Sequence, residues 1–211
     1  MRSMQRLGGL ALMAVCTLAV PKPALAQVTC GAQWKLPPVG GWAEWQSKEG
    51  KAKLALVGQE EKDGKPSYRI ELASGGNVMQ MVVPGFPWQM DQVNEMVVQQ
   101  AGQAPMKMSG PMLDMMKSRM PQGGVGAIAR KCASMKVIGE ESVTVPAGTF
   151  KATHLKNDEG DEVWASADVP FTVVRFRGKG EETVLAGMGK DAKTAIVGTP
   201  TEMQGMGMPR N

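Results

Sequence analysis

The stretch that decides the fold reads PSYRIELASGGNVMQMVV, residues 66–83. Its first half alternates apolar with charged or small side chains, and its second half alternates methionine with valine and glutamine. A period of two residues places successive side chains on opposite faces of a β-strand. Gly75 and Gly76 separate the halves, and glycine adopts tight turn conformations without steric cost. The stretch therefore predicts two antiparallel strands joined by a glycine turn.

The same two-residue period recurs on both sides of this hairpin. Short polar turns separate the segments, which is typical of an antiparallel meander. The predicted strands are 51–57, 68–72, 78–83, 136–141, 142–145, 150–156, 162–166, 172–177, 183–186 and 194–197.

The middle of the chain follows a helical pattern instead. Asp91 can cap a first helix, in which apolar residues recur at i, i+3 and i+4 spacing up to Gln100. Ser109 can cap a second helix that ends at Pro121. Three methionines share one face of the second helix: Met112, Met116 and Met120. Two short amphipathic helices are thus expected within a chain of strands.

Residues 1–26 have the features of an export signal. Two arginines precede the apolar run 7–20, and a small-x-small pattern ends at Ala26, which predicts cleavage before Gln27. A membrane anchor fits less well because a spanning helix needs about 20 apolar residues. A lipoprotein signal around Cys16 also fits less well, because Val15 stands where a small residue is needed. The sequence therefore predicts a periplasmic or secreted protein.

The composition after cleavage predicts one small domain. The net charge of +4 falls to +1, because residues 1–26 hold three basic side chains and no acidic ones. No basic cluster interleaved with aromatic residues remains, so nucleic-acid binding is not expected. No later segment is apolar enough to span a membrane. We predict a single β-rich domain over 27–198 and a disordered tail over 199–211, where periodicity is absent. The oligomeric state is left open.

Two cysteines, Cys30 and Cys132, remain in the mature chain. An even pair in an oxidising compartment favours a disulfide. A loop of this length is worth roughly 4–5 kcal/mol in the chain-entropy account. Two free thiols or a thiolate metal site are the alternatives, and the lack of CxxC spacing disfavours the second.

Methionine is the most unusual feature of the composition, with ten in residues 79–120. Methionine is an unbranched, adaptable apolar side chain, which suits core packing or a surface that receives varied apolar ligands. Thioethers also select Cu(I), and Met106 and Met108 form one of three Met-x-Met pairs. The candidate ligand-binding residues are Met79, Met81, Phe86, Trp88, Met96, Met112 and Met116.

Phe86 and Trp88 belong to an apolar loop that leads into the first predicted helix. They can form the rim of a cavity under a helical lid, or they can plug the end of a sheet.

An enzyme is not predicted. His154 is the only histidine, and it lies in a strand-like run without a nucleophile motif, so a surface histidine is the preferred interpretation. No P-loop, G-x-S-x-G, HExxH or CxxC pattern occurs, so no cofactor is expected.

Two motifs carry a resemblance. Residues 139–152 read GEESVTVPAGTFKA, and residues 162–170 read EVWASADVP. This pair resembles an uncharacterised family of bacterial envelope proteins, similar in outline to the LolA/LolB-like lipoprotein-carrier fold. The resemblance implies a curved sheet with helices over an apolar concave face. The predicted fold class is therefore mainly β (α+β), a curved antiparallel sheet or half-barrel with two short Met-rich helices across one face.

Three functions follow from these patterns. The first is non-catalytic binding of an apolar ligand, a lipid or a lipoprotein segment, between sheet and helices. The second is Cu(I) binding by Met-x-Met pairs in the periplasm. The third is a structural or interaction module of the cell envelope without a small ligand.

Overall fold

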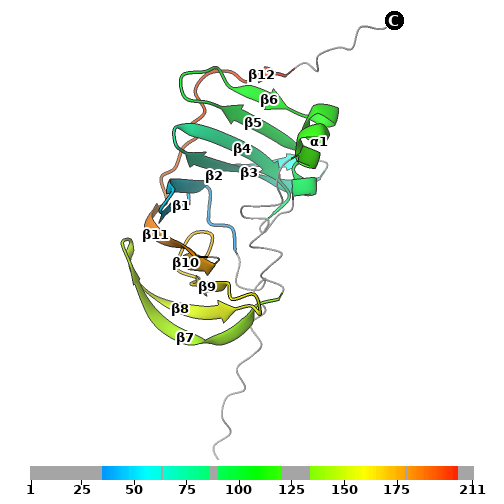
Figure 1. The fold of residues 1–211 in the computed structure, drawn as a ribbon. Helices are drawn as coiled ribbons and strands as arrows, with labels where there is room; N and C mark the ends of the chain where they lie inside the picture. The colour runs from blue at the N-terminus through cyan, green and yellow to red at the C-terminus, as the bar shows by residue number, and fades with distance from the viewer. Residues whose placement is uncertain (1–34, 63, 86–89, 120–133, 179, 204–211) are drawn as a thin grey trace, which may run out of the picture.

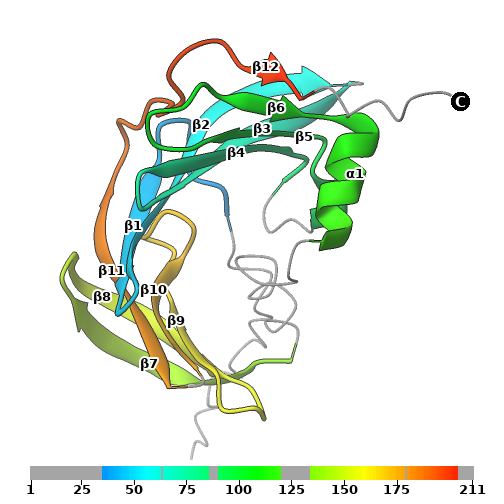
Figure 2. The same ribbon diagram turned by 45° about the horizontal axis from the view of Figure 1, so that its top comes forward.

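A computed structural model of the chain describes residues 35–62, 64–85, 90–119, 134–178 and 180–203. Within them a twelve-stranded sheet forms one open, strongly curved surface (Figure 1, Figure 2). Neighbouring strands pair antiparallel, apart from one short parallel pair at an edge. The mainly β, curved antiparallel prediction is confirmed, and the sheet has a half-barrel outline.

The elements have the following bounds. The strands are β1 Trp42–Ser47, β2 Gly50–Lys62, β3 Lys65–Ser74, β4 Asn77–Val83, β5 Glu95–Gln99, β6 Met106–Met108, β7 Lys136–Val145, β8 Gly148–Lys156, β9 Glu162–Ala165, β10 Val173–Gly178, β11 Glu181–Gly189 and β12 Thr201–Glu202. The helices are the 3₁₀ turn η2 Met90–Gln92 and α1 Gly110–Arg119. Across the sheet the order is β12-β6-β5-β4-β3-β2-β1-β11-β10-β9-β8-β7. The strand β1 therefore joins the β2–β6 part to the β7–β11 part.

The hairpin of β3 and β4 forms as the opening stretch predicts. Ser74 pairs with Asn77, and Gly75 and Gly76 between them both have positive φ, 57° and 80°. Two successive positive φ values match the right-handed twist of the flanking strands, which is why glycine stands at both positions.

The first predicted helix is wrong. Residues 95–99 form β5, which pairs with β4 and β6, and only Met90–Gln92 make a helical turn. Met96 and Val97 are both buried, although they lie on opposite faces of the strand. A strand buried on both faces has a continuous apolar run, and over five residues this run also fits helical spacing. Only the second predicted helix, α1, exists among the described residues.

The strand β1 has no counterpart in the predicted set. The alternation of apolar and polar side chains in β1 is incomplete, because the apolar Trp42 lies on the outer face. There its ring lies next to Gly187 and Gly189 of β11. A Cβ atom on Gly189 would lie 2.5 Å from Nε1 of Trp42. Gly189 thus lets the indole lie directly on the neighbouring strand, where Trp42 donates a hydrogen bond to Asp191 (2.8 Å).

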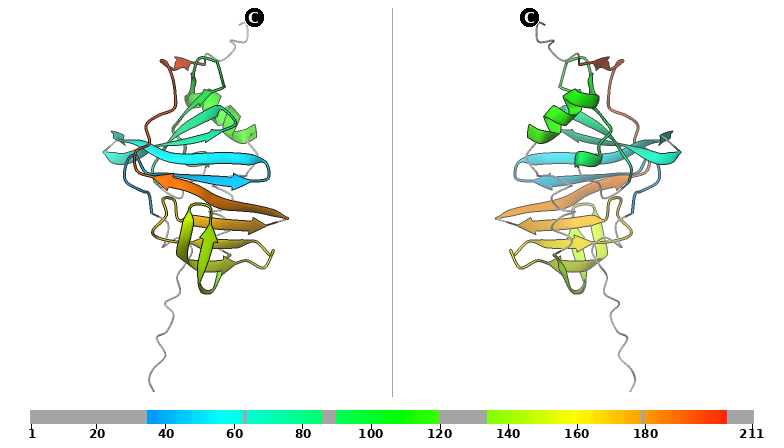
Figure 3. Two further views of the ribbon diagram at one scale, coloured as in Figure 1. Left: turned by 90° about the vertical axis from the view of Figure 1, so that its left-hand side faces the viewer. Right: turned by 90° about the vertical axis from the view of Figure 1, so that its right-hand side faces the viewer.

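The predicted strand 194–197 is also wrong. Residues 190–203, called the C-terminal strap below, run in an extended path over the outer face of the sheet to β12 (Figure 2, Figure 3). Side chains of the sheet hold the strap: Glu71 accepts hydrogen bonds from the Ala195 amide and the Thr194 hydroxyl, both 2.8 Å. The Val197 amide donates to the Gln99 side chain (2.8 Å).

The strap also enters the predicted tail. Thr201 and Glu202 pair in parallel with β6, so the first part of the tail 199–211 is an ordered edge strand. Residues 204–211 lie outside the described residues.

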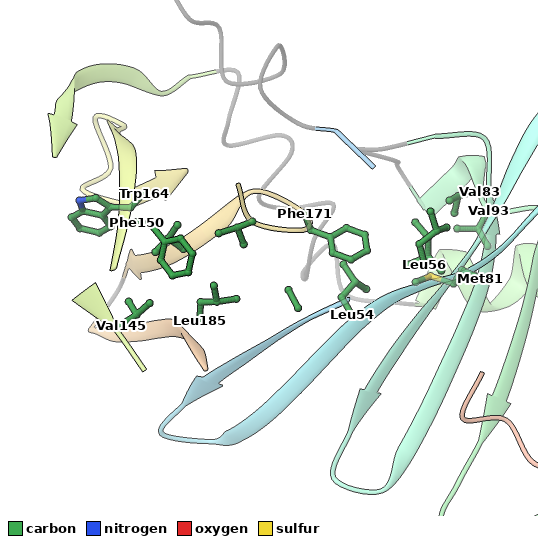
Figure 4. Packing of buried hydrophobic residues seen from close by; sticks show 14 of the residues in the cluster. Leu54, Leu56, Met81, Val83, Val93, Val145, Phe150, Trp164, Phe171 and Leu185 are labelled. Carbon is green, nitrogen blue, oxygen red and sulfur yellow. The ribbon is translucent and has the colours of Figure 1, made fainter. Parts of the chain in front are cut away.

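Buried hydrophobic side chains form one main cluster along the sheet. Figure 4 shows it running from Trp164 and Phe150 through Phe171 to Leu56 and Met81. A smaller cluster around Leu155 and Val163 lies in the β8–β10 part.

Candidate functional site

Methionines of three neighbouring strands lie opposite one another on the inner face of the sheet. Met81 of β4 pairs with Met96 of β5, which pairs with Met108 of β6. The same row continues through Ile70 to Leu56. Directly opposite residues have Cβ atoms about 4.5–5.5 Å apart, so their side chains contact one another across the strands. All five side chains of this row are buried.

A second row runs parallel to the first. Met79 of β4 lies opposite Leu72 of β3 and Val98 of β5, and Val98 lies opposite Met106 of β6. Met79 is partly buried, and Met106 is exposed at the edge of the sheet. The inner face is therefore an apolar, methionine-rich surface across five strands.

The helix α1 lies at one end of this surface, on the inside of the curve, and packs beside β5 and η2 (Figure 2). Gly110 starts it with a φ of 53°, and Pro111 occupies the first turn, where its missing N–H is tolerated. Met112 and Met116 pack against the main cluster, whereas Met115 is 45% exposed. Lys117 donates to the backbone carbonyl of Asp91 (3.3 Å) and so fastens the helix to η2.

Five predicted ligand-binding residues belong to the main hydrophobic cluster or pack against it: Met79, Met81, Met96, Met112 and Met116. Phe86 and Trp88 lie outside the described residues, as do Cys30 and Cys132, so the loop and the disulfide stay predictions. Met106 and Met108 lie on the same inner face, beside the five.

A polar cluster formed by side chains of β7, β8, β9 and β10 was missed by the sequence analysis. His154 of β8 stacks on the Trp164 ring of β9, with centroids 4.3 Å apart. Arg175 and Arg177 of β10 lie over the same indole, at 5.5 and 5.4 Å from its centroid. Trp164 donates its N–H to Glu141, which also lies 3.2 Å from Nδ1 of His154. The single histidine is thus mostly buried in an aromatic and ionic cluster, rather than free at the surface.

Glu162 belongs to this cluster, and its ion pairs lead us to expect that the stability of the protein depends on pH. Lys156 (2.9 Å), with His154 and Arg177 farther away, holds the pKa of the Glu162 carboxyl below its usual range. A carboxyl with a lowered folded-state pKa contributes stability above its unfolded pKa and loses it as pH falls through the folded pKa. We therefore expect the stability difference between wild type and Glu162→Gln to shrink between about pH 5 and pH 3.

Urea denaturation at several pH values measures this difference. Glu159→Gln is the matched control, because Glu159 stands at the preceding turn and has no ion pair among the described residues. A wild-type advantage over Glu162→Gln that stays constant across the window would contradict the prediction.

Among the described residues, no group of three or more His, Cys, Asp or Glu side chains is arranged to hold a metal ion. Within the same part of the chain, no helix is long and apolar enough to cross a membrane.

Two of the solved structures that resemble this chain are distant likenesses. No protein-family model matches the chain, and no curated protein matches it either. A candidate lipoprotein from Parabacteroides distasonis shares 11% identity, with a TM-score of 0.30, over 74% of this chain and 97% of its own. A candidate exported protein with a YmcC-like fold from Bacteroides fragilis shares 11% identity, with a TM-score of 0.31, over 74% of this chain and 99% of its own.

Proposed function

We propose that the chain is an exported, non-catalytic protein that binds an apolar ligand between the inner face of the sheet and α1. The ligand is a lipid or the acylated segment of a lipoprotein. The observation that carries the proposal is that Met79, Met81 and Met96 of the sheet share the main hydrophobic cluster with Met112 and Met116 of α1. The export signal that the sequence predicts at 1–26 supports a periplasmic or secreted location.

The physical argument rests on how these side chains adapt. A methionine side chain has three rotatable bonds and no branch, so a methionine-lined surface can repack around different apolar shapes. The helix α1 has ten residues, a length that is marginal without packing. A ligand can therefore take the place of Met112 and Met116 on the sheet while α1 shifts. Thioethers and aliphatic groups do not transfer protons, which is why we propose binding without catalysis.

Charge placed on the inner side of α1 tests the proposal. Met116→Glu puts a carboxylate against the apolar face, where an unpaired charge is costly to bury. Met115→Glu is the matched control, because Met115 lies on the same helix and points outward. With an uncharged pyrene fatty-acid methyl ester as the probe, we expect wild type and Met115→Glu to bind equally, and Met116→Glu about tenfold more weakly or worse.

Native mass spectrometry of protein purified from its own envelope provides the second measurement, and we expect co-purifying lipid. Circular dichroism checks that both variants are folded. A wild-type protein that carries no lipid and does not bind the probe would refute the proposal, as would equal binding by folded Met116→Glu.

Cu(I) binding is the second candidate. Met108 lies opposite Met96, which lies opposite Met81, so three thioethers of neighbouring strands face the same side. Met106, at the exposed edge, is the accessible member of the Met106/Met108 pair. This candidate stays a prediction, as does the module without a small ligand.

A further inference from the structure

Two adjoining clefts lie away from the methionine-rich face. The first has a volume of about 380 Å³, and most of its walls are apolar: Leu36, Pro37, Pro38, Val169, Pro170 and Met188. The second, of about 350 Å³, has more polar walls, which include Glu140, Lys151, Thr153 and Ser166. Lys35, Ala167 and Asp168 line both clefts. Together they form one surface feature with an apolar end and a polar end, called the two-part groove below.

The two sequence motifs meet in this groove. Glu140 and Lys151 come from the 139–152 motif, on the β7–β8 hairpin. Ser166 and Val169 come from the 162–170 motif, at the end of β9 and in the loop that follows. In the sequence, the first motif corresponds to a hairpin turn and the second to the end of a strand. The fold brings residues of both motifs to the walls of the two-part groove.

The loop between β9 and β10 is held in a costly conformation. Phe171 and Thr172 have φ values of 59° and 63°, although neither is glycine. The left-handed region is unfavourable for a residue with a Cβ atom, and such residues persist only where their surroundings over-determine them. Here Phe171 is buried in the main cluster, and the Thr172 amide donates to the Val169 carbonyl (2.9 Å). The wall formed by Val169 and Pro170 is therefore pre-organised.

The charges around the groove favour an anion. Lys151 and Glu140 neutralise each other as an ion pair (2.7 Å). Lys35 and Lys190 line the apolar cleft and have no ion pair among the described residues. Asp168 is the one acidic side chain that lines the apolar cleft. With Lys35 and Lys190, the charged side chains of this cleft therefore have a net charge of +1.

We propose that the two-part groove binds an anionic amphiphile, an acyl chain that ends in a carboxylate or phosphate. The acyl chain lies along Leu36, Val169 and Met188, and the anionic end lies at Lys35 and Lys190. A cavity of a few hundred Å³ with apolar walls and a few placed polar groups is typical of small-molecule sites. This site is separate from the one under α1 and goes beyond it, because it selects the charge of the ligand.

Binding of decanoate to the full mature chain tests the site, measured by isothermal titration and by the carboxyl shift of ¹³C-labelled decanoate. Lys35→Glu combined with Lys190→Glu turns two attractions into repulsions, so we expect about a tenfold loss of affinity or more. Lys193→Glu is the matched control, three residues from Lys190 and outside the groove lining. Met188→Asp tests the apolar end separately, and we expect a similar loss.

Ligands with other head groups separate the possible outcomes. Decyl phosphate is expected to bind about as well as decanoate, and the two affinities show which anion is preferred. Decanol and decyltrimethylammonium are expected to bind at least about tenfold more weakly, because they lack the negative charge. The proposal is overturned if decanoate does not bind, if the cationic amphiphile binds equally, or if the double Lys variant keeps wild-type affinity. We expect the uncharged pyrene ester that tests the site under α1 not to displace decanoate from the two-part groove, so failure here is distinguishable from failure at α1.

Discussion

Glu71→Ala is expected to lower the free energy of unfolding by about 2–4 kcal/mol and to release the C-terminal strap. Glu71 is 3% exposed, and its carboxylate accepts from the Ala195 amide, the Thr194 hydroxyl and the Gln80 amide (2.8, 2.8 and 3.0 Å). Alanine removes all three acceptor contacts at once. Hydrogen bonds to a charged group contribute about 1.5–3 kcal/mol each, and the donors left behind are no longer satisfied.

Two measurements report this effect. Denaturant unfolding gives the loss of stability, and limited proteolysis followed by mass spectrometry locates new cleavage within residues 190–198. Glu61→Ala is the control, because Glu61 is an exposed acidic residue at the end of β2, and we expect a change within about 0.5 kcal/mol. Glu71→Gln keeps one oxygen acceptor, so it should fall between the two. Wild-type stability with an intact strap in Glu71→Ala would show that the strap is held by other contacts.

The strap also shows why part of the fold could not be predicted. The β3–β4 hairpin could be predicted, because its register follows from a local turn and an alternating pattern. The residues of the strap have no pattern of their own, since their partners are side chains of β3, β4 and β5, more than 90 positions away. Val97 lies opposite Gln80 on the outer face and is buried too, so β5 carries apolar residues on both faces and its run also fits helical spacing. In both segments, contacts that the local pattern does not show decide the structure.

The candidate site was predicted in composition but not in geometry. The methionine content pointed to an apolar surface, and α1 lies where a Met-rich helix was expected. Which methionines lie opposite one another depends on strand register, and β5 and β6 contribute to it although neither was predicted as a strand. The two-part groove unites segments far apart in sequence. No local period indicates such pairs, and only the fold brings them together.

Met96→Ala is expected to cost about 2–5 kcal/mol of unfolding free energy, the usual range for deleting a large core side chain. Met96 is 0% exposed and lies in the buried row on the inner face of the sheet, between Met81 and Met108. Met96→Leu, which nearly conserves volume, should cost less than about 1.5 kcal/mol. Met115→Ala, on the outward side of α1, should stay within about 0.5 kcal/mol. Thermal and denaturant unfolding of the three variants measure the series.

The size of the Met96 effect bears on how the inner face works. A large loss in Met96→Ala together with a small one in Met96→Leu means that the row is closely packed in the ligand-free protein, since the cost of a cavity grows with its volume. An apolar ligand must then displace side chains of α1 to reach the row, and its affinity is reduced by the cost of moving the helix. A small loss in Met96→Ala would instead mean that the face is loosely covered, and the ligand would enter without that cost. Because Met112 and Met116 are only partly buried, we expect close packing at Met96 and a helix that yields at its own contacts.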